Sequence, residues 1–186
     1  MYSRLLNGLG RHDEAVAEIK LAIDLEPASV FNHRLLGVAY YYARRYDEAI
    51  EQFERVIKMD RTGPTIMWLS QTLGQAGRDE EAFKLWIGRF TDLIESDRRE
   101  WQAAFEREGW KGIMRERARR FENSTEIYTH GAAYHAYVGD ADKALAYLET
   151  ALERRENMLQ WLRVDPRFDP IRNEPRFEAF LAKTGL

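Results

Sequence analysis

The sequence contains no cysteine, only 5 prolines among 186 residues, and no long apolar run. The lack of cysteine excludes disulfide bonds, thiolate metal ligands and a cysteine nucleophile, and it is compatible with a reducing compartment. No apolar segment reaches the roughly 18–20 residues that span a bilayer, and the first residues lack the apolar core of a signal peptide. We therefore expect a cytoplasmic chain that has no membrane partner.

The sequence also lacks a large excess of charge of either sign. It has 28 basic and 31 acidic side chains, which gives a net charge of -3 and no whole-chain attraction to nucleic acid. Hydrophobic residues make up 45% of the chain, which is ordinary for a folded protein. A chain of this length is expected to form one domain or a small repeat array.

Four short segments share one pattern, in which a turn is followed by acidic residues and an alanine. The alanines are Ala15, Ala49, Ala82 and Ala144, so the spacings are 34 (15 to 49), 33 (49 to 82) and 62 (82 to 144). The glycine that opens three of the segments can end one helix, and the acidic residues suit the start of the next. A bulky apolar residue four positions after each alanine lies on the same helix face. The pattern predicts helix hairpins with a period near 34 residues.

The stretch from Val30 to Gly63 resembles the tetratricopeptide repeat (TPR) family. Five residues stand at the spacing of that family's signature: Leu36, Gly37, Tyr40, Ala49 and Phe53. The resemblance implies an all-α fold, an α-α superhelix of antiparallel helix hairpins. We expect one domain over residues 1–186, which consists of a truncated repeat (1–29), repeats at 30–63, 64–97 and 125–157, a divergent helical pair (98–122) and a C-terminal cap (158–186).

Helical periodicity predicts the individual helices, and no segment has the alternation of a strand. The helices are expected near 2–8, 12–25, 29–43, 46–59, 64–76, 79–95, 98–108, 111–122, 126–138, 141–155 and 174–183.

The divergent pair at 98–122 is basic, and Gly109 and Gly112 bracket a predicted break in it. It holds eight basic and five acidic residues, a local net charge of +3. Four arginines are clustered there: Arg115, Arg117, Arg119 and Arg120. They could meet phosphate or an acidic partner. The preferred interpretation is a solvated helix face with salt bridges to Glu116 and Glu122, so we expect no nucleic-acid partner.

The C-terminal segment contains two Pro-Arg-Phe triplets, at 166–168 and 175–177. Five apolar residues are predicted to cover the open end of the helix stack: Phe168, Ile171, Phe177, Phe180 and Leu181. The ending at 164–170, together with Gly-Trp-Lys-Gly at 109–112, resembles the C-terminal repeat regions of bacterial multidomain signalling proteins. That resemblance implies an upstream DNA-binding, kinase or cyclase domain. Because the chain begins inside a repeat, we expect a fragment of a longer protein or a protein that keeps only the repeat region.

Motifs for catalysis, metal binding and cofactor binding are almost absent. The sequence has no phosphate-binding loop, dinucleotide fingerprint or Gly-x-Ser-x-Gly elbow. His130 and His135 are five residues apart, unlike the i, i+4 pair of a zinc helix, and Glu126 is predicted to form a surface pair with His130. We expect no enzyme, metal or cofactor. A small α-helical hydrolase is kept as a further hypothesis that would need a pocket with two convergent carboxylates.

The TPR resemblance implies a concave groove that is lined by the leading helix of each hairpin. The candidate partner-binding residues at the matching positions are Phe31, Arg34, Val38, Tyr41, Tyr42, Met67, Gln71, Gln75, Thr129, Ala133 and Tyr137. Such a mixture of aromatic, amide and arginine side chains suits peptide recognition. Val38 and Met67 stand where some members carry a Lys/Asn clamp for a peptide carboxylate, which argues against an adaptor for chaperone tails.

The leading functional hypothesis is therefore a non-catalytic scaffold for protein–protein interaction. Its groove would bind a peptide, a helix or a partner domain, including a neighbouring domain of the same polypeptide. The alternative is a regulatory or sensory domain of a bacterial signalling protein, which would act by self-association or small-ligand binding. An oligomer therefore stays an open alternative.

Overall fold

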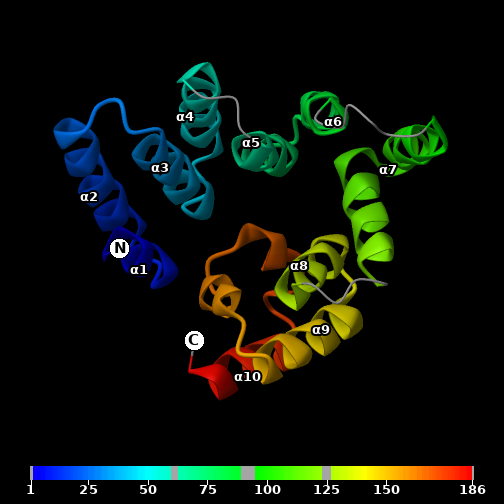
Figure 1. The fold of residues 1–186 in the computed structure, drawn as a ribbon. Helices are drawn as coiled ribbons and strands as arrows, with labels where there is room; N and C mark the ends of the chain where they lie inside the picture. The colour runs from blue at the N-terminus through cyan, green and yellow to red at the C-terminus, as the bar shows by residue number, and fades with distance from the viewer. Residues whose placement is uncertain (1, 60–62, 89–94, 123–126, 186) are drawn as a thin grey trace. The chain divides into compact units, whose positions relative to one another are not determined.

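The computed structural model describes residues 2–59, 63–88, 95–122 and 127–185. Within these ranges every regular element is an α-helix or a 3-10 helix, and there is no strand (Figure 1). The predicted all-α fold of consecutive, TPR-like helix hairpins is confirmed. The chain divides into two compact units, Met1–Arg98 and Arg99–Leu186, and each is described by itself. A single domain over the whole chain stays a prediction.

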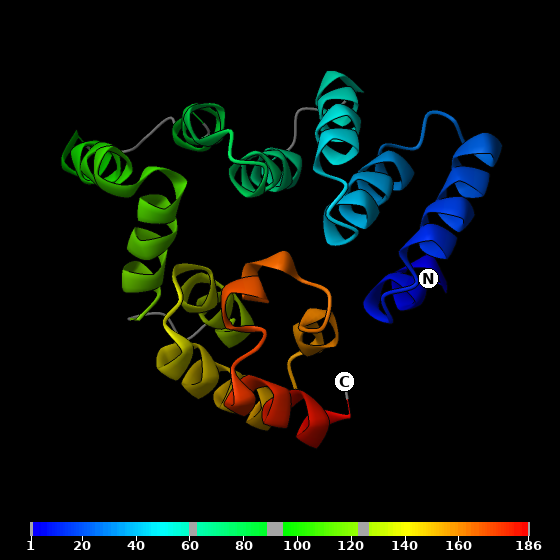
Figure 2. The same cartoon turned by 180° about the vertical axis from the view of Figure 1, so that it is seen from behind.

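The first unit is a series of helices in which each helix packs on the next one in the sequence, as Figures 1 and 2 show. The helices of this unit are α1 (Tyr2–Gly8), α2 (His12–Leu25), α3 (Val30–Tyr42), α4 (Tyr46–Met59), α5 (Gly63–Gln75) and α6 (Asp79–Ile87). The helix predicted at 79–95 ends at Ile87 with Gly88 as its C-cap, and residues 89–94 lie outside the described residues.

The repeated alanines of the first unit lie in the interior of the helix hairpins. Ala15, Ala49 and Ala82 are completely buried. The signature residue Gly37 allows a close approach of two helices, because a Cβ atom there would lie 2.6 Å from Cε1 of Phe53. Small residues at these positions therefore let α3 and α4 pack as a tight hairpin.

The turns between helices use the left-handed backbone conformation that the sequence pattern predicts. Gly10, Gly77 and Gly139 have φ angles of 76°, 75° and 90°. Arg44 occupies the equivalent turn between α3 and α4 with a φ of 59°. A residue with a side chain is strained in this region, by roughly 1–2 kcal/mol, so three of the four turns use glycine.

The second unit begins within α7 (Glu95–Phe121), which is two helices joined at a kink. Glu108 (φ -142°) and Gly109 (φ 58°) leave the helical conformation, so the predicted break occurs at the first of the two bracketing glycines. Gly112 lies against the preceding segment, since a Cβ atom there would lie 1.9 Å from the carbonyl oxygen of Ala104. The two arms of α7 thus meet with backbone against backbone.

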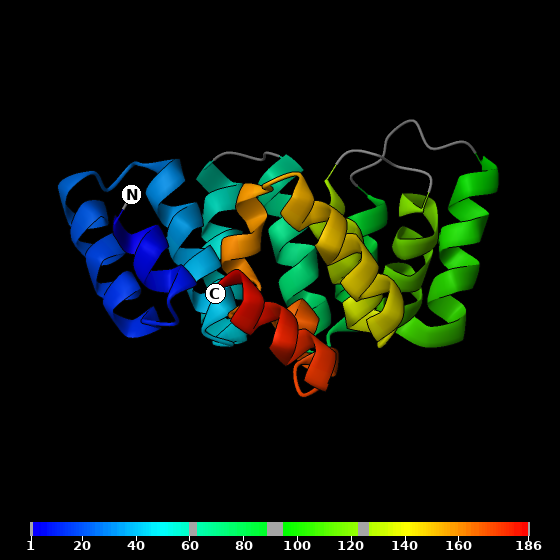
Figure 3. The same cartoon turned by 90° about the horizontal axis from the view of Figure 1, so that it is seen from below.

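The remainder of the second unit is one hairpin and an irregular C-terminal segment. The hairpin consists of α8 (Tyr128–Val138) and α9 (Ala141–Glu153), and residue 126, where α8 was expected to begin, lies outside the described residues. The segment contains η1 (Asn157–Trp161), η2 (Pro166–Ile171) and α10 (Pro175–Thr184), and Figure 3 shows α10 beside α9.

The C-terminal segment packs against the apolar face of the last hairpin. Phe168, Ile171, Phe177 and Phe180 join one core cluster with Ala132, Ala133, Ala144 and Leu148, and Leu181 packs against it. The rings of Phe168 and Phe177 stack with centroids 5.6 Å apart. Burial of these aromatic rings ties η2 and α10 to the hairpin.

Candidate functional site

The predicted groove residues of the first unit differ in how accessible they are on α3 and α5. Phe31 is 55% exposed, and four others are half-buried: Arg34, Val38, Met67 and Gln75. The Arg34 guanidinium lies 5.9 Å from the centre of the Phe31 ring, a cation–π distance that joins the two side chains into one surface feature. This pair, in the first turns of α3, is the accessible part of the predicted groove face.

Tyr41 and Tyr42 belong to the core of the first unit. They are 0% and 2% exposed, and the Tyr41 ring lies 5.4 Å from Tyr42 and 5.3 Å from Trp68 in edge-on contacts. Their role in the structure is aromatic packing between α3 and α5, and partner contact at these two positions stays a prediction.

Two amides follow each other on one face of α5. Gln71 is buried and Gln75 lies one turn later, and the Nε2 atoms of both are buried with no hydrogen-bond partner among the described residues. An unsatisfied buried donor costs roughly 1–3 kcal/mol. A hydrogen bond from either amide to a carbonyl oxygen would remove this unfavourable free energy.

The other three predicted groove residues belong to the second unit, where α8 holds them. Thr129 and Ala133 are buried, and Tyr137 is half-buried. The backbone N–H and the hydroxyl of Thr129 both donate to the carboxylate of Glu156. Thr129 is therefore engaged in holding the start of α8, and partner contact by these residues stays a prediction.

The arginines of the basic segment make contacts within the chain. Arg119 and Arg120 each lie 2.6 Å from Oε1 of Glu116. Arg115 pairs with Glu108 at 2.8 Å, and the Arg117 guanidinium lies 4.1 Å from the centre of the Tyr134 ring. The predicted salt bridge to Glu122 is wrong, because Glu122 pairs with Lys143 at 2.5 Å. The salt bridges to Glu116 agree with the predicted pairing within the segment, but the Glu116 carboxylate is only 10% exposed, so this part of the helix face is not solvated.

The histidines are held in structural environments. His33 lies between the Pro27 carbonyl oxygen (2.9 Å) and the Gln52 amide (2.7 Å).

Burial, with the positive charges of Arg167 and Arg117, lowers the pKa of His130 from 6.5 to about 4, so its ring is neutral near pH 7. The expected partner Glu126 lies outside the described residues. Among the residues that the structure describes, no three His, Asp or Glu side chains are grouped to hold a metal ion.

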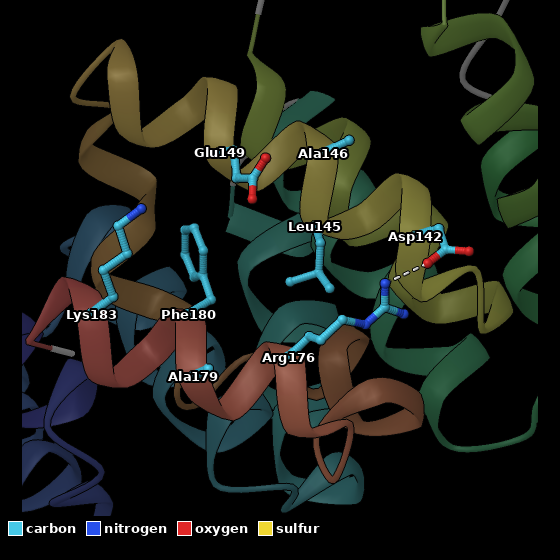
Figure 4. A pocket seen from close by; sticks show the side chains of 8 residues that line it. All are labelled: Asp142, Leu145, Ala146, Glu149, Arg176, Ala179, Phe180 and Lys183. Carbon is cyan, nitrogen blue, oxygen red and sulfur yellow. Dashed lines mark hydrogen bonds and ion pairs between the residues drawn. The ribbon is translucent and has the colours of Figure 1, made fainter.

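A recess of the second unit lies between α9 and α10, where sequence reasoning identified no site (Figure 4). This α9–α10 groove has a volume of about 470 Å³. Eight residues line it: Asp142, Leu145, Ala146, Glu149, Arg176, Ala179, Phe180 and Lys183. On each helix they follow the i, i+3, i+4, i+7 pattern of one face. That repeated pattern was the signal in the sequence that could have identified the groove.

The two carboxylates of the groove do not form a catalytic pair. Asp142 and Glu149 are seven residues apart on one helix, which places them roughly 10 Å apart along its axis. Asp142 is also exposed and paired with Arg176 at 2.7 Å. General acid–base catalysis needs groups that reach one reacting centre. The groove therefore lacks the convergent carboxylates that the hydrolase hypothesis requires.

Two family models, both described as tetratricopeptide repeat, match the chain, one at residues 1–29 and the other at residues 30–62. No curated protein matches it. The matched ranges correspond to α1–α2 and α3–α4, so the family match and the hairpin geometry agree. They support a TPR protein, and repeats of this kind generally mediate protein–protein interaction. Among the described residues, no helix is both long enough and apolar enough to cross a membrane.

Proposed function

We propose that the chain is a non-catalytic scaffold that holds a peptide or a helix of a protein partner against the leading helices α3 and α5. The observation that carries the proposal is the contact between the exposed Phe31 and the half-buried Arg34 on the predicted groove face of α3. Aromatic and arginine side chains dominate the affinity of protein interfaces, because they bury a large area and form several hydrogen bonds. Either another protein or a neighbouring domain of the same polypeptide can supply the bound segment.

The chemistry of α5 supports the same partner class. The Nε2 groups of Gln71 and Gln75 lie one turn apart, buried and without an acceptor among the described residues, and rotation of either side chain toward the groove face would present an amide donor there. Main-chain carbonyl oxygens of a bound peptide are acceptors for such groups, and they do not depend on the peptide's side chains. Met67 adds a flexible apolar side chain on the same helix, which can adapt to different apolar residues. The proposed partner therefore places an apolar or acidic side chain against Phe31 and Arg34. Its main-chain carbonyl groups face the two glutamines.

Calorimetry with peptides selected on the immobilised chain from a random library tests this proposal. Phe31→Ala and Arg34→Ala should each weaken binding by about tenfold or more. Leu25→Ala removes another exposed apolar side chain, at the end of α2, and should leave binding unchanged. Tyr41→Ala is unsuitable as a test, because it would disturb the aromatic core rather than recognition alone. If the selected peptides bind Phe31→Ala and Arg34→Ala as tightly as they bind the wild type, the assignment of the binding site to α3 and α5 is refuted.

A further inference from the structure

Helix α1 presents an exposed apolar stripe. Tyr2, Leu5 and Leu9 are 56%, 56% and 59% exposed, and their i, i+3, i+7 spacing places them on one face. The N–H of Leu9 donates to the carbonyl oxygen of Leu5 at 3.0 Å, so the helical turn continues through Leu9. Leu6 is almost fully buried, on the side of α1 that packs against α2. Single exposed apolar residues are ordinary, whereas several on one helix face form a surface that binding can cover.

The α9–α10 groove has the form that receives such a stripe. Leu145 and Phe180 are buried at its floor, and Figure 4 shows both side chains between the two helices. Ala146 and Ala179 are exposed and small, so they leave room beside that floor. Amphipathic helices bind in apolar grooves of this kind through residues at i, i+3, i+4 and i+7.

The lengths of the two surfaces agree. The groove extends from Asp142 to Glu149 on α9 and from Arg176 to Lys183 on α10, so the first and last residues are seven positions apart on each helix. The first and last residues of the stripe, Tyr2 and Leu9, are also seven positions apart, and a separation of seven positions along a helix is roughly 10 Å. Two turns of helix therefore fill the groove from end to end.

The charges at the edge of the groove are compatible with α1. The ion pair between Asp142 and Arg176 (2.7 Å) closes one end, and Glu149 and Lys183 stand near the other end in Figure 4. Within the described residues, the side chain of Glu149 has no hydrogen bond or ion pair. Arg4 is the only charged side chain of α1, and it directly precedes Leu5 of the stripe. When the stripe docks, this cation can approach the acidic wall that α9 provides.

From these matching surfaces we infer that α1 of one molecule docks in the α9–α10 groove of a second copy of the chain. The two faces are different, so the contact is heterologous and each added molecule leaves one stripe and one groove free to continue. The inference is independent of the partner proposed for α3 and α5. One short helix in one groove is a small contact, so the association is weak and reversible.

Sedimentation velocity and light scattering test the inference on the whole chain, between about 10 µM and about 1 mM, where weak contacts of this size become populated. The mean mass of the wild type should rise with concentration beyond that of a dimer. Leu5→Asp places a charge in the stripe, and Ala179→Arg fills the groove. Each variant should stay mainly monomeric over this concentration range, because the substitution should raise the dissociation constant about tenfold or more. The matched controls are Leu21→Asp on α2, which is equally exposed, and Ala182→Arg on α10, and both should associate like the wild type.

A mixture of the two variants separates this contact from all others. Leu5→Asp keeps an intact groove and Ala179→Arg keeps an intact stripe, so together they should form a one-to-one dimer that grows no further. Circular dichroism should show that each variant keeps the wild-type helix content. A wild type that stays monomeric at the highest concentration overturns the inference. Loss of association in Leu5→Asp but not in Ala179→Arg also overturns it, because the stripe would then pair with another surface.

Discussion

The guanidinium of Arg167 pairs with the carboxylate of Asp165 at 2.6 Å, and the two side chains are only 12% and 3% exposed. The same carboxylate accepts from the backbone N–H of Arg167, and Arg172 donates to the carbonyl oxygen of Asp165 at 2.9 Å. These bonds hold the turn at Pro166 that begins η2. The second Pro-Arg-Phe triplet lacks this arrangement, since Arg176 pairs with exposed carboxylates.

Replacement of Arg167 should therefore destabilise the second unit. Arg167→Ala leaves the Asp165 carboxylate buried without its counter-ion, which typically costs about 3–5 kcal/mol of unfolding free energy. Arg176→Ala is the matched control from the other triplet, and we expect no measurable loss there because its ion pairs are exposed. Urea unfolding monitored by circular dichroism compares them. Equal midpoints for the two variants would contradict a stabilising role of the buried pair.

Glu156 should contribute to stability as a cap for a helix that lies far away in the sequence. Its carboxylate accepts from the backbone N–H groups of Tyr128 and Thr129, both at 2.9 Å, at the start of α8. Burial alone would raise the pKa of Glu156, but these hydrogen bonds prevail and hold it below its usual value. Glu156→Ala should cost about 2 kcal/mol of unfolding free energy, since the first N–H groups of α8 lose their acceptor.

Glu153→Ala is the control for the Glu156 prediction, because Glu153 is an exposed carboxylate at the end of α9. Thermal unfolding should show a lower Tm only for Glu156→Ala. Equal Tm values would mean that α8 begins without help from this side chain.

The local features of the fold could be predicted from the sequence. The spacing of Ala15, Ala49 and Ala82 identified the buried contact points of three hairpins, because a helix hairpin depends on residues that are close in the sequence. The position of the kink at Gly109 could be predicted for the same reason, since few other residues adopt its φ of 58°.

The candidate site was less predictable, because it depends on packing between helices. Family resemblance predicts Tyr41 as a groove residue, and nothing in the sequence pattern indicates that its ring packs against Trp68 on another helix. The pattern of the α9–α10 groove is visible in each helix separately. The groove also requires α10 to lie beside α9, and the irregular segments η1 and η2 bring it there. Helical periodicity does not predict irregular turns of this kind.

Gly112 should tolerate no side chain. A Cβ atom there would lie 1.9 Å from the carbonyl oxygen of Ala104, and backbone cannot move aside as a flexible side chain can. Alanine normally gains roughly 1 kcal/mol over glycine within a helix. The clash outweighs that gain, and we expect Gly112→Ala to lose about 3 kcal/mol of unfolding free energy, at the upper end for overpacking.

Gly63→Ala is the matched control, because a Cβ atom there meets no described atom within 4 Å. Chemical unfolding should leave Gly63→Ala as stable as the wild type or slightly more stable. A Gly112→Ala variant of wild-type stability would show that the two arms of α7 separate at little cost.

His130 should make the stability of the chain depend on pH below neutrality. Burial is the main cause that lowers its pKa from 6.5 to about 4, and the nearby charges of Arg167 and Arg117 act in the same direction. Between these two pH values the unfolded chain binds a proton at His130 and the folded chain does not, so the free energy of unfolding falls as the pH is lowered through this window. The contribution of His130 is complete above about pH 6.5, and its total loss by pH 4 amounts to about 3 kcal/mol.

Urea unfolding of the wild type and of His130→Gln, at several pH values from about 7 to about 4, isolates this contribution. Other groups that titrate in this range, such as His12 and His135, whose pKa values are also lowered mainly by burial, act in both proteins and cancel in the comparison. The wild type should therefore lose more stability than the variant over this window, whatever the variant's stability at pH 7. Parallel pH profiles would show that His130 accepts its proton equally well in the folded and unfolded chains, and that its burial against Arg167 and Arg117 does not oppose protonation.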